Sequence, residues 1–149
     1  MGDLFLPSQL FLLIGFVCVL CLLPTIFYLL TLQKALGKCA PGVRTMEPGL
    51  VWLNLIPLVN LVFNFFIVFA LSDSLRGEYA RRGLAAPEAE PGKGLGLAMC
   101  ICMCCGIIPF LGILASLAGL VLWIMYWVKI AEYSRMLDMP VMTAYGSAR

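Results

Sequence analysis

The chain has 149 residues, of which 62% are hydrophobic and 12% charged, whereas soluble domains carry about 45–50% apolar and about 25% charged residues. This composition excludes a separate soluble catalytic domain. The absence of histidine removes His-ligated haem and zinc sites and any imidazole general base. A net charge of +2 without a concentrated basic stripe argues against a nucleic-acid binder.

The first predicted element is the uncharged run from Leu10 to Leu32, which is long enough to cross the ~30 Å hydrocarbon layer of a bilayer. It exceeds the usual length of a signal-peptide h-region and no basic segment precedes it. We therefore expect a retained transmembrane helix over residues 10–32. A polar loop over residues 33–48 follows, with Pro41-Gly42 and Pro48-Gly49 as helix breakers.

The second predicted helix covers residues 49–82 and is uncharged up to Leu71. Pro57 should kink it or divide it into a short lead-in and a longer main helix. Residues 72–82 should continue the helix into water, because their charges recur at the i,i+3 and i,i+4 spacings of an exposed helix. Residues 83–93, rich in Ala, Pro, Glu and Gly, are predicted to form a mobile linker.

Residues 95–128 form an uncharged run that is too long for one ordinary membrane span. A tight turn at Gly106, Pro109 and Gly112 would divide it into helices over 94–108 and 110–138, followed by a loose tail over 139–149. One long, kinked and tilted helix is the alternative. We therefore predict an all-α fold, a single transmembrane domain formed by a bundle of four transmembrane helices.

An internal repeat supports this division. The segment Leu55–Asn60 (LIPLVN) echoes Ile107–Gly112 (IIPFLG), and each leads through an apolar helix to a similar exit, Glu78–Arg81 (EYAR) and Glu132–Arg135 (EYSR). Units built alike should run in the same direction through the membrane, as parallel repeats do. Chance similarity between two apolar stretches is the alternative. The exits themselves suit anchoring at the membrane interface or docking of a partner.

The distribution of Lys and Arg predicts the orientation. With four crossings, both termini and residues 72–94 share one side, which holds seven Lys and Arg, whereas residues 33–48 hold three on the other side. The positive-inside rule then places both termini in the cytoplasm. A three-helix version would put the C-terminus outside.

Three asparagines, Asn54, Asn60 and Asn64, lie within the second predicted span. Asn60 and Asn64 share one helix face at i,i+4, beyond the break at Pro57. They would either line a small polar cavity or ligand site, or form hydrogen bonds between helices, because a buried amide without a partner costs free energy.

Small residues on the last predicted helix form two small-xxx-small pairs, which let helix backbones approach closely in a membrane. The pairs are Gly112 with Ser116 and Ala115 with Gly119. They are candidates for helix packing, either within this chain or against another one.

The dense cysteine cluster on the third predicted helix is the remaining candidate site, formed by Cys100, Cys102, Cys104 and Cys105. Soft thiolates bind Cu(I), zinc or iron–sulfur clusters, which makes this a weak metal candidate. Charged thiolates are costly in hydrocarbon, however, and the four residues point around the helix. Packing is the favoured interpretation, with lipidation or redox chemistry as a further alternative, and no cofactor is expected.

Several landmarks resemble those of small bacterial multi-pass membrane proteins of unknown function. They are the pattern Trp52-x4-Pro57-x2-Asn60 and Ile108-Pro109-x-Leu111-Gly112, with the Ser72–Leu75 and Trp123–Ala131 segments. The resemblance implies a bacterial inner-membrane setting and a helical fold, and it implies no activity. The cysteine cluster departs from the pattern of that group.

No catalytic constellation and no ionisable group deep in a predicted span is found in the sequence. We therefore expect a structural or accessory subunit of a membrane protein complex, with membrane lipids and other membrane subunits as partners, rather than an enzyme. The alternative is a small-molecule or lipid-binding, transporter-like module that uses Asn60 and Asn64.

Overall fold

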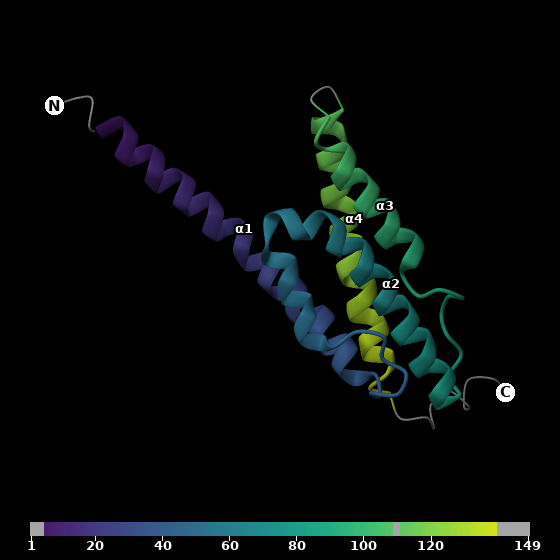
Figure 1. Cartoon of the computed structure of the whole chain (residues 1–149). Helices are drawn as coiled ribbons and strands as arrows, with labels where there is room; N and C mark the ends of the chain where they lie inside the picture. Colours follow the sequence, from purple (N-terminus) through teal and green to yellow (C-terminus); the bar gives the residue numbers. More distant parts are fainter. Residues whose placement is uncertain (1–4, 109–110, 140–149) are drawn as a thin grey trace. The chain divides into compact units, whose positions relative to one another are not determined.

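The computed structural model describes residues 5–108 and 111–139, and over these residues it is helical with no strand. The helices in chain order are α1 (Phe5–Lys38), the 3-10 helix η1 (Pro48–Leu55), α2 (Pro57–Arg82), α3 (Lys93–Cys105) and α4 (Gly112–Met136) (Figure 1). The all-α prediction is confirmed. Pro109 of the predicted turn and residues 140–149 of the predicted tail lie outside the described residues.

Helix α1 extends through Lys38, so residues 33–38, for which the sequence predicts a polar loop, are helical. Ala35 and Leu36 are fully buried there, and this packing extends the helix. Pro24 lies inside the helix, and the neighbouring Thr25 hydroxyl donates to the carbonyl oxygen of Cys21 at 2.8 Å. Such side-chain bonds to the backbone accompany prolines in membrane helices. By its contacts the chain divides into two compact units, residues 1–30 and 31–149.

The segment predicted as the second helix consists of two elements, η1 and α2, with Ile56 between them in an extended conformation. Pro57 lies in the first turn of α2, where its missing N–H would have no helical partner in any case. The helix ends at Gly83, whose φ of 66° lies in the left-handed region that favours glycine. A short 3-10 lead-in therefore precedes the main helix.

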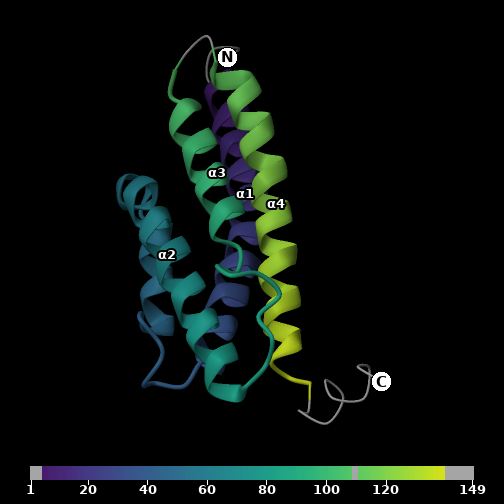
Figure 2. The same cartoon turned by 90° about the vertical axis from the view of Figure 1, so that its right-hand side faces the viewer.

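Helices α3 and α4 lie side by side in both views (Figures 1 and 2). A Cβ added at Gly96 of α3 would lie 2.6 Å from Val68 Cγ1 of α2 and 2.9 Å from Tyr126 Cε2 of α4. One at Gly119 of α4 would lie 3.6 Å from Cys102 Cβ of α3. The two helices are therefore antiparallel and close-packed, and they do not form one long kinked helix.

Three stretches among the described residues are long and apolar enough to cross a membrane: Gln9–Lys38, Val59–Arg82 and Gly112–Met136. Helix α3 has 13 residues, which span about 20 Å at 1.5 Å per residue, less than the hydrocarbon thickness of ~30 Å. Three of the four predicted spans thus have suitable helices, and the crossing of α3 stays a prediction.

Candidate functional site

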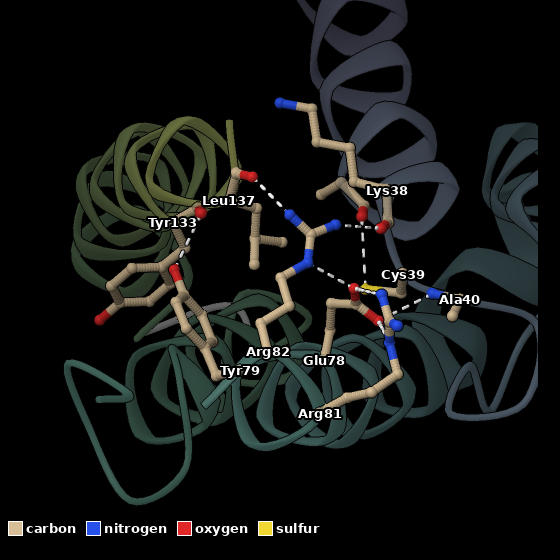
Figure 3. A network of polar contacts seen from close by, with 10 residues as sticks. Lys38, Cys39, Ala40, Glu78, Tyr79, Arg81, Arg82, Tyr133 and Leu137 are labelled. Carbon is tan, nitrogen blue, oxygen red and sulfur yellow. Dashed lines mark hydrogen bonds and ion pairs between the residues drawn. The ribbon is translucent and has the colours of Figure 1, made fainter. Parts of the chain in front are cut away.

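A buried carboxylate, that of Glu78 on α2, is the centre of an ionic cluster (Figure 3). It accepts hydrogen bonds from Arg81 Nη2 and Arg82 Nε, each at 2.6 Å. The backbone N–H of Ala40 donates to its second oxygen at 2.9 Å, and Arg81 Nε donates to the same oxygen at 3.1 Å. Burying a carboxylate is costly unless it is paired and hydrogen-bonded, and both conditions are met here.

Arg82 and Tyr79 connect this cluster to the ends of two other helices (Figure 3). Arg82 donates through Nη1 to the carbonyl oxygen of Leu137 at 2.5 Å and through Nη2 to that of Lys38 at 3.2 Å. The Tyr79 hydroxyl donates to the carbonyl oxygen of Tyr133 at 2.9 Å. The last carbonyls of a helix have no partner within the helix. A cation there is also favoured by the helix dipole, so these contacts fasten the three C-terminal ends together.

Lys38 completes the polar end of the bundle. Its ammonium donates to the carbonyl oxygen of Ser134 at 2.7 Å and to Asp138 Oδ2 at 2.6 Å. The exit of the second predicted helix and the end of α1 therefore lie at the same end of the bundle. The sequence predicts that residues 33–48 and 72–94 lie on opposite sides of a membrane, whereas the structure brings Lys38 and Ala40 into contact with Arg82 and Glu78.

The loop after α1 explains this difference. The backbone N–H of Thr45 donates to Ser74 Oγ at 3.0 Å, and the Thr45 hydroxyl donates to the carbonyl oxygen of Ala70 at 2.8 Å. The loop therefore packs against the later half of α2, and η1 must lead back to the start of that helix. The sequence-based prediction treats each apolar run as one complete membrane crossing. In the structure, η1 instead leads the chain back from the end that α1 has reached to the start of α2.

The sequence predicts an exposed helix over residues 72–82, and the structure differs from this prediction at Glu78, whose side chain is buried. Arg81 is half exposed as expected, whereas the Glu78 side chain is 0% exposed. A Cβ at Gly77 would lie 3.2 Å from Val43 Cβ, so the loop approaches α2 where a side chain is absent. Gly77, beside Glu78, is a sequence signal that is consistent with this close approach.

The thiol of Cys39 lies buried beside this cluster. Burial, and the nearby carboxylate of Glu78, raise the pKa of Cys39 to about 11. A neutral thiol is neither a good nucleophile nor a metal ligand. Cys39 therefore contributes packing to the polar end of the bundle.

The two exits of the internal repeat meet at this end. Because Tyr79 and Arg82 bind carbonyl groups near the end of α4, α2 and α4 run in the same direction, as the repeat predicts. The environments of the repeated glutamates differ, since Glu78 is buried and Glu132 is exposed. The repeat therefore describes the course of the backbone, and the ionic cluster forms at one of its two copies.

The linker between α2 and α3, predicted to be mobile, is held against α4. Glu88 forms an ion pair with Lys129 of α4 and accepts a hydrogen bond from the backbone N–H of Gly92 at 3.2 Å. Gly92 has a φ of 71°, and a Cβ there would lie 3.1 Å from Ile130 Cδ1. The linker is therefore a packed connection that sets the start of α3.

The attachment of this linker should depend on pH through Glu88. The Lys129 ammonium, followed by the Gly92 N–H, holds the pKa of the Glu88 carboxyl below its usual range. A lowered folded-state pKa contributes stability above the unfolded value of about 4.3, and this contribution is lost as the pH falls through the folded pKa. Hydrogen-exchange protection of residues 84–92 should stay constant from about pH 7 to pH 5 and fall below about pH 4.

Substitutions at Glu88 and Glu90 test whether Glu88 is responsible for the protection of the linker. Glu88→Gln should lower the protection already at neutral pH, because the ion pair to Lys129 is absent. Glu90→Gln removes only the pair that Glu90 forms with Lys93, three residues away in the chain, and should leave the linker protected. Equal loss in both variants would contradict the role assigned to Glu88.

Two of the three candidate asparagines come together at a cavity of about 70 Å³, lined by Asn60, Leu61, Asn64, Cys100 and Met103. Asn64 Nδ2 donates to Asn60 Oδ1 at 2.5 Å. Asn64 is only 5% exposed, and among the described residues its Oδ1 has no hydrogen-bond partner. Asn54 is also buried but lies in η1 and does not line this cavity.

The candidate cysteines do not form one site. Cys100 is buried and lines the cavity, whereas Cys102, Cys104 and Cys105 are half-buried. Across residues 5–108 and 111–139, no three His, Cys, Asp or Glu side chains are grouped in a way that would hold a metal ion. Cys102 lies against the glycine face of α4, which is a packing role.

The small residues of α4 are used within this chain. A Cβ at Gly112 would lie 2.8 Å from the carbonyl oxygen of Gly106, and one at Gly106 would lie 3.3 Å from Ser116 Oγ. Gly119 faces Cys102, and Ala115 is half-buried. The glycines and Ser116 therefore bring α3 and α4 close together.

Comparison with known proteins gives no match, whether with protein-family models, curated proteins or solved structures.

Proposed function

We propose that this chain is an integral membrane protein that serves as a structural or accessory subunit of a membrane protein complex. The observation that supports this proposal is that the charged groups around Glu78 form their contacts within this chain. Both oxygens of Glu78 and three nitrogens of Arg82 bind groups of this same chain. Such a cluster holds helix ends in place and leaves no charged atom of these two residues for a substrate.

A fixed polar end suits a protein that works by packing. The contacts from α2 to Lys38 and Leu137 restrain the ends of three helices, while large apolar side chains cover the outside of α4, including Leu117, Val121 and Ile124. Helices associate in lipid through close packing rather than through the hydrophobic effect. A bundle with restrained ends loses less conformational freedom when it packs against membrane lipids and partner subunits.

Affinity purification from native membranes in mild detergent tests this role. We expect the tagged chain to elute as a discrete assembly with the same membrane proteins in constant ratio. Glu78→Gln, expressed in a folded state at low temperature, should retain fewer of these proteins, and Glu132→Gln should retain all of them. Elution of the intact chain as a lone monomer would refute the proposal.

The second candidate is a small-molecule or lipid-binding, transporter-like module. The observation that favours it is the cavity beside Asn60 and Asn64, because ligand sites in membrane proteins often lie at helix breaks near the bilayer midplane. Pro57 marks such a break, four residues before Leu61 of the cavity lining.

We also propose a bacterial inner-membrane location, which follows from the resemblance of the sequence landmarks, with the polar end in the cytoplasm. No Lys or Arg precedes Lys34, and the positive-inside rule favours the cytoplasm for the end that carries Lys38, Arg81 and Arg82. If α1 crosses the membrane, the residues before it lie outside. This replaces the expectation that both termini are cytoplasmic, which relied on residues 33–48 lying across the membrane from 72–94.

The side of the N-terminus can be measured directly. A protease site placed before Met1 should be cleaved when protease is added to intact spheroplasts. The same site inserted after Gly42 in the loop that follows α1 should be cleaved only after lysis. The reverse pattern would contradict the proposed orientation.

A further inference from the structure

We infer that the cavity between Asn60, Asn64 and Cys100 is a binding site for the neutral hydroxyl group of a membrane-dissolved amphiphile, such as a long-chain alcohol or a diacylglycerol. The inference rests on the second candidate function, for which it names the class of ligand, and it does not depend on the proposed structural role.

The argument begins with the amide of Asn64. Its Nδ2 is engaged by Asn60 Oδ1, which leaves Asn64 Oδ1 as a buried acceptor with no partner among the described residues. In apolar surroundings an unsatisfied amide oxygen costs free energy, and a donor that reaches it recovers this cost. Asn64 lines the cavity, so a donor that enters it lies beside the side chain that carries this oxygen.

The size of the cavity limits what can enter. Its volume of about 70 Å³ is well below the roughly 300 Å³ at which pockets for whole drug-sized molecules begin. It is ample for more than one water-sized group, since a share of about 30 Å³ belongs to each water in the liquid. The occupant is therefore the small end of a larger molecule.

The lining sets the chemistry of that end. None of the five lining residues is charged, so a charged headgroup would enter without a counter-ion at great cost. A hydroxyl can donate to Asn64 Oδ1 and accept from the amide Nδ2 of Asn60, because it is both a donor and an acceptor. A ketone or ester offers only acceptors and would leave Asn64 Oδ1 unsatisfied.

The remaining lining residues indicate where the rest of the molecule lies. Leu61 and Met103 are 39% and 37% exposed, so the cavity opens at the apolar surface of α2 and α3. An occupant whose hydroxyl lies beside Asn64 can keep its hydrocarbon chain outside, in the lipid. Membrane lipid is therefore favoured over a water-soluble alcohol as the source of the hydroxyl.

Photoaffinity labelling of the full chain in detergent micelles tests this site. Octanol carrying a diazirine is the probe, and an octane of matched length and diazirine position is the control. We expect the alcohol to label peptides that contain residues 60–64 or 100–103, at least tenfold more than the octane does. Unlabelled dioctanoylglycerol should compete at far lower concentration than glycerol, which separates lipid from water-soluble sources.

Substitutions test whether Asn60 and Asn64 are responsible for the labelling by the alcohol. Asn60→Leu/Asn64→Leu should lose at least tenfold of the labelling, and Asn54→Leu, which removes another buried amide outside the cavity, should keep it. Cys100→Met fills the cavity while both asparagines stay, and it should also lose labelling, which decides the matter if the double variant does not fold. Equal labelling by alcohol and octane, or undiminished labelling of the folded Cys100→Met variant, would overturn the inference.

Discussion

Replacing Glu78 with glutamine lowers the free energy of unfolding by about 3 kcal/mol, near the lower limit for breaking a buried ion pair. The loss arises because Arg82, only 29% exposed, keeps its charge while its carboxylate partner disappears. Glutamine has the shape of glutamate, so the change removes charge without creating a cavity. Unfolding of the variant in detergent micelles, followed by circular dichroism against denaturant or temperature, measures the effect.

The internal repeat supplies the matched control. Glu132 occupies the equivalent position in the second EYxR exit but is exposed, so Glu132→Gln should change the free energy of unfolding by less than about 0.5 kcal/mol. If the two variants were equally stable, the ionic cluster would have no special role in holding the helix ends.

Replacing Gly96 with alanine should lower the free energy of unfolding by about 2 kcal/mol, a typical cost of overpacking. The added Cβ would lie 2.6 Å and 2.7 Å from the two Cγ atoms of Val68 and 2.9 Å from the Tyr126 ring. Val68 is fully buried and branched at Cβ, which strongly restricts its side-chain rotamers in a helix. Helix α3 must therefore move away from both α2 and α4, and the same unfolding measurement reports the loss.

Gly94 provides the control in the same helix, two residues earlier. A Cβ there meets nothing within 4 Å, and alanine is a better helix former than glycine by up to about 1 kcal/mol. Gly94→Ala should therefore leave stability unchanged or raise it slightly. Destabilisation by Gly94→Ala as large as that by Gly96→Ala would mean that the close contact of α3 with its neighbours is not the cause.

Both predictions concern residues whose structural role the sequence does not predict, for two different reasons. Glu78 belongs to a pattern of helix-surface charges, and Gly96 lies in a run of small and apolar residues. Their importance comes from groups that reach them from elsewhere. The N–H that binds Glu78 belongs to Ala40, 38 positions earlier, and the atoms nearest Gly96 belong to Val68 and Tyr126.

The candidate asparagine site also has one part that the sequence predicts and another that depends on tertiary contacts. The i,i+4 spacing of Asn60 and Asn64 predicts that they share a face, and their hydrogen bond agrees with it. The cavity, however, also needs Cys100 and Met103 from α3. The separation of Asn54 from this pair follows from the break between η1 and α2, which places Asn54 in another element.

The sequence by itself predicted the helical class, the common direction of α2 and α4, and four apolar membrane spans, of which three have helices long enough to cross a membrane. It left open whether Pro57 kinks one helix or divides the segment into two. These predictions follow from local properties: the length of an apolar run, the missing N–H of proline, or similar segments in one chain. Only the tertiary structure decided that Lys38 lies beside Asp138, 100 residues away, and that Glu78 is buried. Whether a charged residue faces water or a neighbouring segment depends on the path of the backbone between them. A loop that turns back along the helix it precedes has the same composition as one that stays on the far side of a membrane.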